Sequence, residues 1–300
     1  MVKINMDLQT LKYFCTVCQE GSFLSASRKL NYAQSNLSAS VAQLEKKLGC
    51  VLLIRRKSGV VPTKKGFVLL EYARKILRLT EKAESAVQTG QAAESRLAIG
   101  SMESTAITFL PALLKTFHTI CPDTKVSVCT GTSAATVQKV LNNELDGSFI
   151  AGGSIHAELS SVSVRTEKLV LVSNHTLEAA SLTELLQQPL VVFPYGCFYR
   201  HILENLLAEQ NILPDHFIDM VSIGALISSI SAGLGIGLLP ESAIRVFSFA
   251  DLLSIHQIPE PYCHAEVKFV YHRDSDSDRP LGRFIEVIQQ GLPEYQAIGE

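Results

Sequence analysis

Residues 21–49 read GSFLSASRKLNYAQSNLSASVAQLEKKLG, and this stretch decides the fold of the N-terminal third. Ser22 stands before a short run of apolar residues at helical spacing, and a two-residue turn separates this run from a longer one that ends at a glycine. A serine before the first turn and a glycine after the last are typical of helix ends. The spacing therefore predicts helices over residues 23–30 and 34–48, joined as a helix-turn-helix pair.

The neighbouring segments add a further helix and two strands to this pair. Leu11 and Phe14 belong to an apolar stripe that predicts a helix over residues 8–20. After the pair, apolar runs at 51–54 and 60–61 flank basic residues, as expected for two short strands joined by a basic turn. Together these elements predict a small winged domain.

A long helix is expected over residues 63–88, where apolar residues recur three or four positions apart. It is too long and too apolar for a linker in a monomer, so we expect it to pair with a second copy of itself. Residues 89–95, TGQAAES, break this pattern and form the expected hinge.

The net charge of -2 conceals two unlike parts of the 300-residue chain. Residues 1–90 carry 15 Lys and Arg against 6 Asp and Glu, whereas residues 91–300 carry 12 against 23, so the sum is +9 plus -11. A 47% hydrophobic content excludes a disordered chain, and a basic segment joined to an acidic remainder is typical of a nucleic-acid module attached to another domain.

Beyond the hinge, strands alternate with helices, which predicts mostly parallel sheets covered on both faces and two α/β lobes with a cleft between them. We expect strands over 97–101, 126–129, 148–151, 169–173, 190–193 and 236–239, and helices over 106–118, 134–141, 198–209 and 223–231.

No membrane partner is expected. The uncharged stretch 220–240 contains four glycines and four serines between acidic flanks, and it predicts a buried helix followed by a strand. The first residues lack the apolar core of a signal peptide, and the seven cysteines lie far apart. These features predict a reduced, cytoplasmic setting.

The chain resembles the LysR-type family of transcriptional regulators. In the winged part the resemblance rests on the order and spacing of Leu11, Phe14, Val17, Gly21, Ser22, Phe23, Ala26, Leu30, Gln34, Ser35, Leu37, Ser38, Val41, Leu44, Glu45, Leu48, Gly49, Leu52, Arg55, Thr63 and Gly66. It continues through Pro122-Asp123, Leu145-Asp146-Gly147 and the sequence AGLGIGLLP at 232–240. The chain departs from the family pattern at Ser27, Leu53 and Ser40, the last of which occupies a recognition-helix place often held by Arg or Gln.

The resemblance implies a multidomain α/β protein in three parts. These are a winged helix-turn-helix DNA-binding domain over 1–64, a dimerising linker helix over 65–90, and a two-lobed, periplasmic-binding-protein-like effector domain over 91–300. The first lobe is expected at about 91–163 and 267–300, and the second at about 164–266.

A reader of duplex DNA needs side chains that reach base edges and cations that hold phosphates. The predicted DNA-binding residues lie on the outward face of the second helix of the pair, on the wing and just after it: Gln34, Ser35, Ser38, Ala39, Gln43, Arg55, Arg56, Lys57, Thr63 and Lys65. We expect Gln34 and Ser38 to read bases. Phosphates or the minor groove are expected to contact Arg55, Arg56, Thr63 and Lys65. The alternative is an ordinary solvated helix and loop.

Cysteines and glycines suggest other chemistries, none of which the sequence completes. Cys15 and Cys18 form a CxxC, but no second pair completes a zinc set, so we expect them in the core and predict no metal site and no cofactor. The glycines of 233–237 follow a helix and precede a strand, opposite to a dinucleotide loop. No nucleophile, base and oxyanion hole assemble, so no catalytic residue is assigned.

Effector-binding residues are expected outside the carboxyl ends of strands, near helix N-termini. The predicted residues are Ser101, Glu103, Ser104, Thr105, Gly131, Thr132, Ser133, Tyr195, Cys197, Tyr199 and Arg200. Helix capping would explain the serines without a ligand, and dipole compensation would explain Glu103. Cys197 could contact a ligand or act as a redox sensor. If Glu103 and Arg200 both face the cleft, a zwitterionic or amino-containing metabolite is expected.

The family resemblance implies a sequence-specific transcriptional regulator, not an enzyme, in which a metabolite between the lobes changes the placement of the DNA-binding domains. The expected partners are double-stranded DNA with a dyad-related promoter site, a small-molecule effector and further copies of the chain in a homodimer or homotetramer, with RNA polymerase as a further candidate. One alternative is a small-molecule receptor with a vestigial DNA-binding domain, and a more distant one is an enzyme built on the α/β part.

Overall fold

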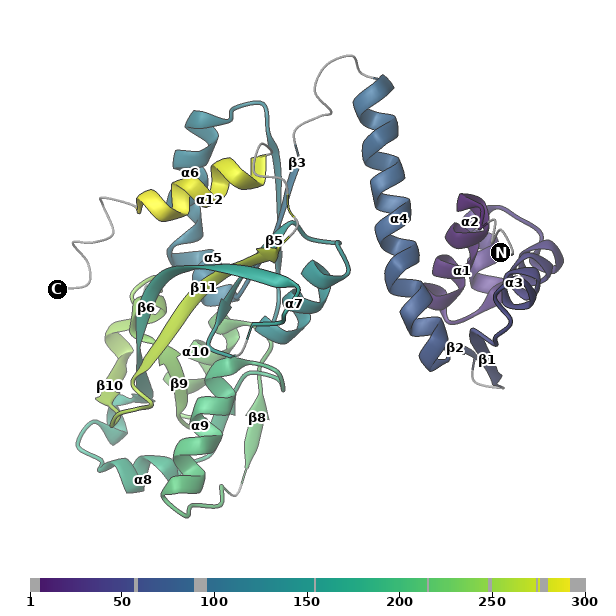
Figure 1. The fold of residues 1–300 in the computed structure, drawn as a ribbon. Coiled ribbons are helices and arrows are strands. Elements are labelled where there is room, and N and C mark those ends of the chain that lie inside the picture. The colour runs from purple at the N-terminus through teal and green to yellow at the C-terminus, as the bar shows by residue number, and fades with distance from the viewer. Residues whose placement is uncertain are drawn as a thin grey trace. The chain divides into compact units, whose positions relative to one another are not determined.

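The computed structural model describes residues 6–56, 59–88, 96–153, 155–214, 216–247, 250–273, 275 and 280–291 (Figure 1). The chain forms two compact units, Met1–Ala93 and Glu94–Glu300. The expected hinge at 89–95 lies outside the described residues.

The first unit packs three helices around one small core: α1 (Leu8–Glu20), α2 (Phe23–Leu30) and α3 (Gln34–Leu48). Asp7 caps α1 and Ser22 caps α2, in each case by accepting a backbone N–H of the first turn. Glycines with positive φ follow α1 and α3, as the stop signals predicted. Phe14, Leu37 and Val41 are completely buried where the helices meet, so the helix-turn-helix prediction is confirmed.

The wing consists of the antiparallel strands β1 (Leu53–Arg56) and β2 (Gly59–Pro62). The strand begins at Leu53 and not at residue 51 as expected. The Glu45 carboxylate on α3 accepts the N–H groups of Leu52 and Leu53 at 2.7 and 3.0 Å and holds the chain at this point. Arg55 and Arg56 consequently lie on a strand and not in the turn.

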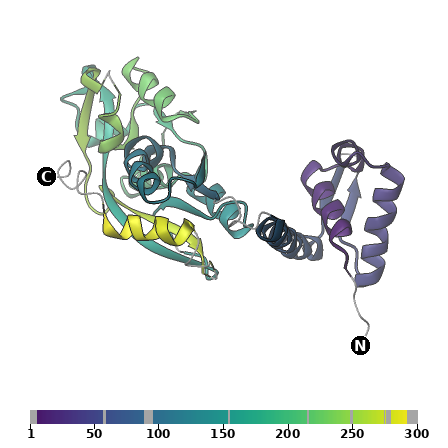
Figure 2. The same cartoon turned by 90° about the horizontal axis from the view of Figure 1, so that it is seen from above.

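The long helix α4 (Lys64–Gln88) follows the wing directly and confirms the predicted helix (Figures 1 and 2). Its first turn lies against the wing at Gly66, where an added Cβ would come within 2.1 Å of the Leu52 carbonyl oxygen. A glycine is therefore required for this close approach.

A seven-stranded sheet runs through both lobes of the second unit. Five of its strands form the first lobe, namely β3 (Arg96–Ser101), β4 (Lys125–Thr130), β5 (Gly147–Ala151), β6 (Leu159–Asn174) and β11 (His264–His272), in the order β6-β11-β5-β3-β4. Successive residues of β3, β5 and the 269–270 part of β11 alternate between two apolar clusters, so both faces of the sheet are covered there, whereas β4 is largely exposed. The covering helices are α5 (Glu103–Thr108), α6 (Leu110–Ile120), α7 (Ser133–Leu141) and α12 (Pro280–Gln290).

The second lobe is built on the continuation of β6 (Figure 1). Residues 169–174 of β6 pair with β9 (Gly237–Pro240) and β10 (Leu253–Gln257), while β7 (Leu190–Val192) and β8 (Phe217–Asp219) form a small parallel pair. Its helices are α8 (Leu182–Leu186), α9 (Phe198–Glu209), α10 (Ile223–Ser231) and α11 (Glu241–Ile244), with short 3₁₀ turns at His175–Leu177 and Ala250–Leu252.

The expectation of mostly parallel sheets is wrong. β3 pairs in parallel with β4 and β5, but β11 is antiparallel to β5 and β6, and β6 is antiparallel to β9 and β10. Where one face of the sheet is exposed, β6 and β11 alternate polar and apolar residues. This alternation predicts a strand less clearly than the continuous apolar run of a buried parallel strand does.

The expected single helix at 106–118 is also wrong, because the chain forms α5 and α6 with a break at Phe109. Pro111 explains the break, since proline has no N–H for the helix ladder and its ring clashes with the carbonyl four residues earlier. Within the described part of the chain, no helix combines the length and apolar character needed to cross a membrane.

Candidate nucleic-acid interface and interlobe cavity

The outward face of α3 carries the residues predicted to read DNA. Leu37, Val41 and Leu44 are buried, and the opposite side of the helix presents polar and small side chains. Four of the predicted residues are exposed and Ser38 is half-buried; the exposed ones are Gln34, Ser35, Ala39 and Gln43. The exposed side of α3 is therefore a mostly polar surface that a partner can contact along the length of the helix.

The wing places two cations on one exposed strand. The Arg55 guanidinium lies over the Phe23 ring at 4.8 Å from its centroid, a cation–π contact between the wing and the start of α2. Arg56 is exposed on the same strand, and Lys57 lies outside the described residues. This contact restrains one arginine before any partner binds.

Thr63 and Lys65 occupy unlike environments at the start of α4. The Thr63 hydroxyl donates to the Val51 carbonyl at 2.9 Å and accepts the Gly66 N–H at 3.0 Å. Thr63 is thus a structural link between the wing and α4, whereas Lys65 is exposed.

Cys15 and Cys18 lie half-buried on α1 and pack against the core of the first unit. Burial raises the pKa of the Cys15 thiol to about 11 and that of the Cys18 thiol to about 12. Both thiols therefore stay protonated near neutral pH, as expected for cysteines that act as small apolar groups.

A cavity of about 660 Å³ lies between the two lobes of the second unit. Its wall comes from α7, from residues 150–156 after β5, and from residues 195–204 at the start of α9. The apolar part of the wall is formed by Ala134, Val137, Leu141, Ile150 and Phe198, and the polar part by Gln138, His156, Cys197, Arg200, His201 and Glu204. The cavity is thus amphipathic and contacts both lobes.

Four predicted effector-binding residues line this cavity: Ser133, Tyr195, Cys197 and Arg200. The others lie outside its wall, namely Ser101, Glu103, Ser104, Thr105, Gly131, Thr132 and Tyr199. No sequence signal selects His156, His201 or Gln138, because an isolated imidazole or amide belongs to no motif. Only their position on walls brought together by folding reveals them.

The lobes approach closely beside the cavity, at Gly152 and Phe198. Gly152 has φ +57, and a Cβ there would come within 1.9 Å of the Phe198 ring. Glycine is therefore required both by the left-handed backbone and by the aromatic ring from the other lobe.

Arg200 and Glu103 are both engaged by protein groups. The Arg200 guanidinium is 3% exposed, donates to Asp219 at 2.5 Å and Glu204 at 2.8 Å, and stacks on Tyr195. The Glu103 carboxylate accepts the N–H of Ile223, the first residue of α10, at 2.9 Å. The structure therefore does not bring Glu103 and Arg200 together around one ligand.

The residues between β4 and α7 form a helix start. The Thr132 hydroxyl caps α7 by accepting the Ala135 N–H at 3.3 Å, and the Ser133 hydroxyl accepts the Ala151 N–H at 3.2 Å. Gly131 donates its N–H to the Ser101 carbonyl at 3.0 Å. Thr132 is therefore the cap of α7, and the capping interpretations of Ser133 and Ser104 are wrong, because Ser133 bonds to β5 and the cap position of α5 is held by Met102.

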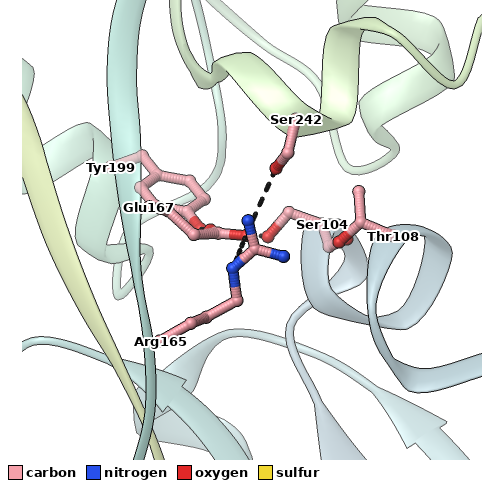
Figure 3. A network of polar contacts seen from close by, with 6 residues as sticks. All are labelled: Ser104, Thr108, Arg165, Glu167, Tyr199 and Ser242. Atoms are coloured by element: carbon pink, nitrogen blue, oxygen red, sulfur yellow. Dashed lines mark hydrogen bonds and ion pairs between the residues drawn. The ribbon is translucent and has the colours of Figure 1, made fainter. Parts of the chain in front are cut away.

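A buried polar network centred on Glu167 joins the two lobes (Figure 3). Tyr199 on α9 donates its hydroxyl proton to Glu167 on β6 at 2.9 Å, and the Ser104 hydroxyl on α5 lies 3.0 Å from the same phenol oxygen. Ser242 on α11 donates to the other Glu167 oxygen at 3.4 Å, and the Arg165 guanidinium lies 4.0 Å from it. Three elements, β6, α9 and α11, thus meet at the Glu167 carboxylate, and α5 joins them through the Tyr199 phenol.

Burial controls the protonation of this network. Glu167 is 1% exposed, and burial raises the pKa of its carboxyl although Arg165, Tyr199 and Ser242 partly offset this effect. Burial likewise raises the pKa of Tyr199 well above its ordinary value and raises that of the Cys197 thiol. Sequence reasoning missed Glu167 and Arg165, because a carboxylate in an alternating strand is usually exposed.

Among the described buried side chains, the Thr105 hydroxyl has no hydrogen-bond partner. Thr105 is 1% exposed and lies on α5 next to Ser104. Ser101 is also buried, and its hydroxyl donates to the Met102 carbonyl at 2.9 Å.

Two family models cover most of the chain. The model described as "Bacterial regulatory helix-turn-helix protein, lysR family" matches residues 8–67, and the one described as "LysR substrate binding domain" matches residues 90–293. The first match contains α1 to α3 and the wing, and the second contains the interlobe cavity.

Curated relatives and solved structures agree with these matches. The chain is 35% identical over 281 residues to the HTH-type transcriptional regulator GltR of Bacillus subtilis (strain 168), covering 93% of this chain and 95% of that protein. It is 34% identical to YofA of the same organism, covering 95% and 99%. The crystal structure of full-length CbnR with its target DNA is 22% identical, with a TM-score of 0.67, and covers 95% of this chain and 99% of that one, which shows a shared fold.

Proposed function

The chain belongs to the LysR family of transcriptional regulators, and on this premise we propose that a small molecule bound between the lobes controls DNA binding by the winged unit. The protein is a DNA-binding transcriptional regulator with an effector-binding domain. Its curated relatives are transcriptional regulators, and we propose that this chain likewise has no catalytic activity. We propose that it acts in the cytoplasm, where its target DNA would be located. The proposed parts are a DNA-binding domain over 1–64, a linker helix over 65–90 and an effector domain over 91–300.

The winged unit has two surfaces suited to duplex DNA. We propose that α3 enters the major groove, with Gln34 and Ser38 at base edges, while Arg55 and Arg56 on the wing hold phosphates or the minor groove. The basic charge of residues 1–90 supports this assignment, since cations on the protein supply most of the affinity for a polyanion.

A homodimer, alone or within a homotetramer, is supported by α4. Large apolar side chains are exposed along this helix, namely Phe67, Val68, Tyr72, Ile76 and Leu79. A second copy that covers them would present two winged units related by a two-fold axis. Such a dimer matches a dyad-related promoter site, where RNA polymerase is a further proposed partner.

The effector assignment rests on one observation, which is that both lobes contribute residues to the cavity wall. Two wall segments come from the first lobe and one from the second, so a ligand would contact both lobes at once. Such a ligand would favour one arrangement of the lobes over another by its difference in affinity for the two. That difference is the free energy available for control of DNA binding.

The wall also defines the chemistry of the ligand. A molecule with an apolar part would pack on α7 and present polar groups to His156 and His201. Arg200 already has two carboxylate partners, so a simple acid would have to compete with Asp219 and Glu204 for it. We propose that the Cys197 thiol is a contact rather than a redox sensor, because burial raises its pKa and disfavours the reactive thiolate.

A cavity-filling substitution tests this assignment in the full-length protein. Ala134 and Ala135 are adjacent, exposed residues of α7, but only Ala134 lines the cavity. A metabolite library that includes amino acids, amines, acids and sugars is screened for stabilisation in a thermal-shift assay. A compound that stabilises the wild type and Ala135→Trp but not Ala134→Trp supports the proposal, and equal stabilisation of all three contradicts it.

A further inference from the structure

Three chemically different side chains converge where β11 begins. Glu260, Cys263 and His264 follow the pattern E-x-x-C-H, and one donor atom from each lies within 4.8 Å of the other two. His264 Nδ1 is 3.2 Å from Cys263 Sγ and 3.0 Å from Glu260 Oε1. The cluster lies outside the wall of the interlobe cavity.

The backbone holds this cluster in place. The Cys263 carbonyl accepts the Leu169 N–H on β6 at 2.8 Å, and the Tyr262 N–H donates to the Pro259 carbonyl at 3.0 Å. His264 is the first residue of β11 and pairs with Lys168. Two of the three donors therefore stand on sheet-anchored residues, and the third lies one turn earlier in the connecting loop.

Hydrogen bonds already draw the three groups together, because the Cys263 thiol and the His264 Nδ1–H can both donate to the Glu260 carboxylate. A divalent ion would take the place of these two protons, since it accepts a lone pair from sulfur, nitrogen and oxygen at the same time. The convergence of three donor atoms therefore also suits a shared cation.

The donor set selects a class of cation. Thiolate and imidazole ligands suit zinc and similar borderline-soft ions, whereas magnesium and calcium prefer oxygen ligands alone. Tetrahedral zinc with ordinary bond lengths separates neighbouring ligand atoms by about 3.3–3.7 Å. The observed 3.0 and 3.2 Å are slightly shorter, a difference that small side-chain rotations remove.

We propose that Glu260, Cys263 and His264 bind a zinc-class divalent cation with three protein ligands. The Glu260 and His264 side chains are 69% and 51% exposed, so water can reach the ion and complete its coordination. The nearby Lys168 ammonium, which would oppose a cation, is paired with Glu241 at 3.4 Å. This site is separate from the effector cavity, and it contains neither a CxxC nor paired histidines, the patterns by which a sequence usually reveals a zinc site.

Cobalt(II) titration of the reduced full-length protein tests the proposal, because thiolate-bound cobalt has a near-ultraviolet charge-transfer absorption. We expect one equivalent per chain in the wild type, no charge-transfer band in Cys263→Ser, and affinity at least about tenfold lower in His264→Gln. Cys129→Ser and His118→Gln, which change the same residue types elsewhere in the second unit, should behave as the wild type.

Competition for zinc between the protein and a chromophoric chelator compares the zinc affinities of the same variants, since zinc itself has no visible absorption. Circular dichroism confirms that each variant is folded. Absence of the band in the wild type overturns the proposal. Retention of the full band in folded Cys263→Ser also overturns it, since another thiol would then be the ligand.

Discussion

The two units place their functional surfaces in opposite ways. In the first unit the candidate interface is one exposed helix face and one strand, both within residues 34–56, and the charge of residues 1–90 is +9. In the second unit the candidate site is internal, and its wall comes from three segments between residues 133 and 204 in a segment of charge -11. A surface site can change without loss of stability, whereas an internal site shares its residues with the packing of the lobes.

The largest expected effect is in the second unit, at the contact between the lobes. Gly152→Ala introduces a Cβ within 1.9 Å of the Phe198 ring at a left-handed backbone position, and it should lower the free energy of unfolding by about 2–4 kcal/mol. Gly153→Ala has the same backbone strain with no atom within 4 Å, so it should cost only about 1–2 kcal/mol. Calorimetry of both variants measures the difference; equal losses would show that the interlobe contact is unimportant.

The next effect belongs to the first unit and is on DNA affinity, since loss of the Arg55–Phe23 contact should lower the free energy of unfolding by only about 0.5–1 kcal/mol. Removal of both wing cations in Arg55→Ala/Arg56→Ala should weaken promoter binding by about tenfold to a hundredfold and lower the salt slope by about 2. The control Arg245→Ala/Arg283→Ala removes two exposed arginines of the second unit and should not change affinity. Fluorescence anisotropy over a range of salt concentrations measures both quantities. An unchanged slope in the wing variant would exclude phosphate contacts there.

A smaller effect should appear in the pH dependence of the buried network. Burial raises the pKa of Glu167 in the folded protein, so the folded state binds this proton more tightly than the unfolded chain does. The stabilisation is complete below the unfolded pKa of about 4.3 and is lost as pH rises through the higher folded pKa. Glu167→Gln should therefore gain stability relative to the wild type as pH rises through this window, measured by urea unfolding. The exposed Glu178→Gln should follow the wild-type profile.

The smallest effect distinguishes a helix cap from a ligand contact. Thr132→Ala removes the side-chain cap of α7 and should lower the free energy of unfolding by about 1 kcal/mol. Because Thr132 does not line the cavity, the affinity for a stabilising compound should stay within about twofold once the change in stability is allowed for. A tenfold loss of affinity would instead make Thr132 a ligand residue.

The first unit was largely predictable because its signals are local. Ser22, Gly21 and Gly49 mark helix ends within a few residues of the helices themselves, and the predicted bounds of α2 and α3 agree with the structure. The shift of β1 was not predictable, since it depends on the Glu45 carboxylate, which lies seven or eight residues away and gives no sign of its backbone partners.

The second unit was less predictable because its sheet depends on distant pairings. β6 and β11 meet across about a hundred residues, and nothing in either strand specifies that partner. Ser133, Tyr195, Cys197 and Arg200 line the cavity, but Glu103 and Ser104 join other elements of the protein. The rule that ligands collect at the ends of parallel strands selected residues on both lobes, but it could not distinguish residues that line the cavity from residues that hold the lobes together. The assigned DNA-binding and effector-binding residues, and the exact domain limits, stay predictions.

The coupling of the two units is tested most directly by promoter affinity with and without a compound that stabilises the protein. In the wild type and Ala135→Trp, we predict that a saturating compound changes the dissociation constant by at least about fivefold, the lower range of allosteric coupling. In Ala134→Trp the affinity should not respond. An equal response in Ala134→Trp, or an unchanged affinity in all three proteins, would contradict control through the interlobe cavity.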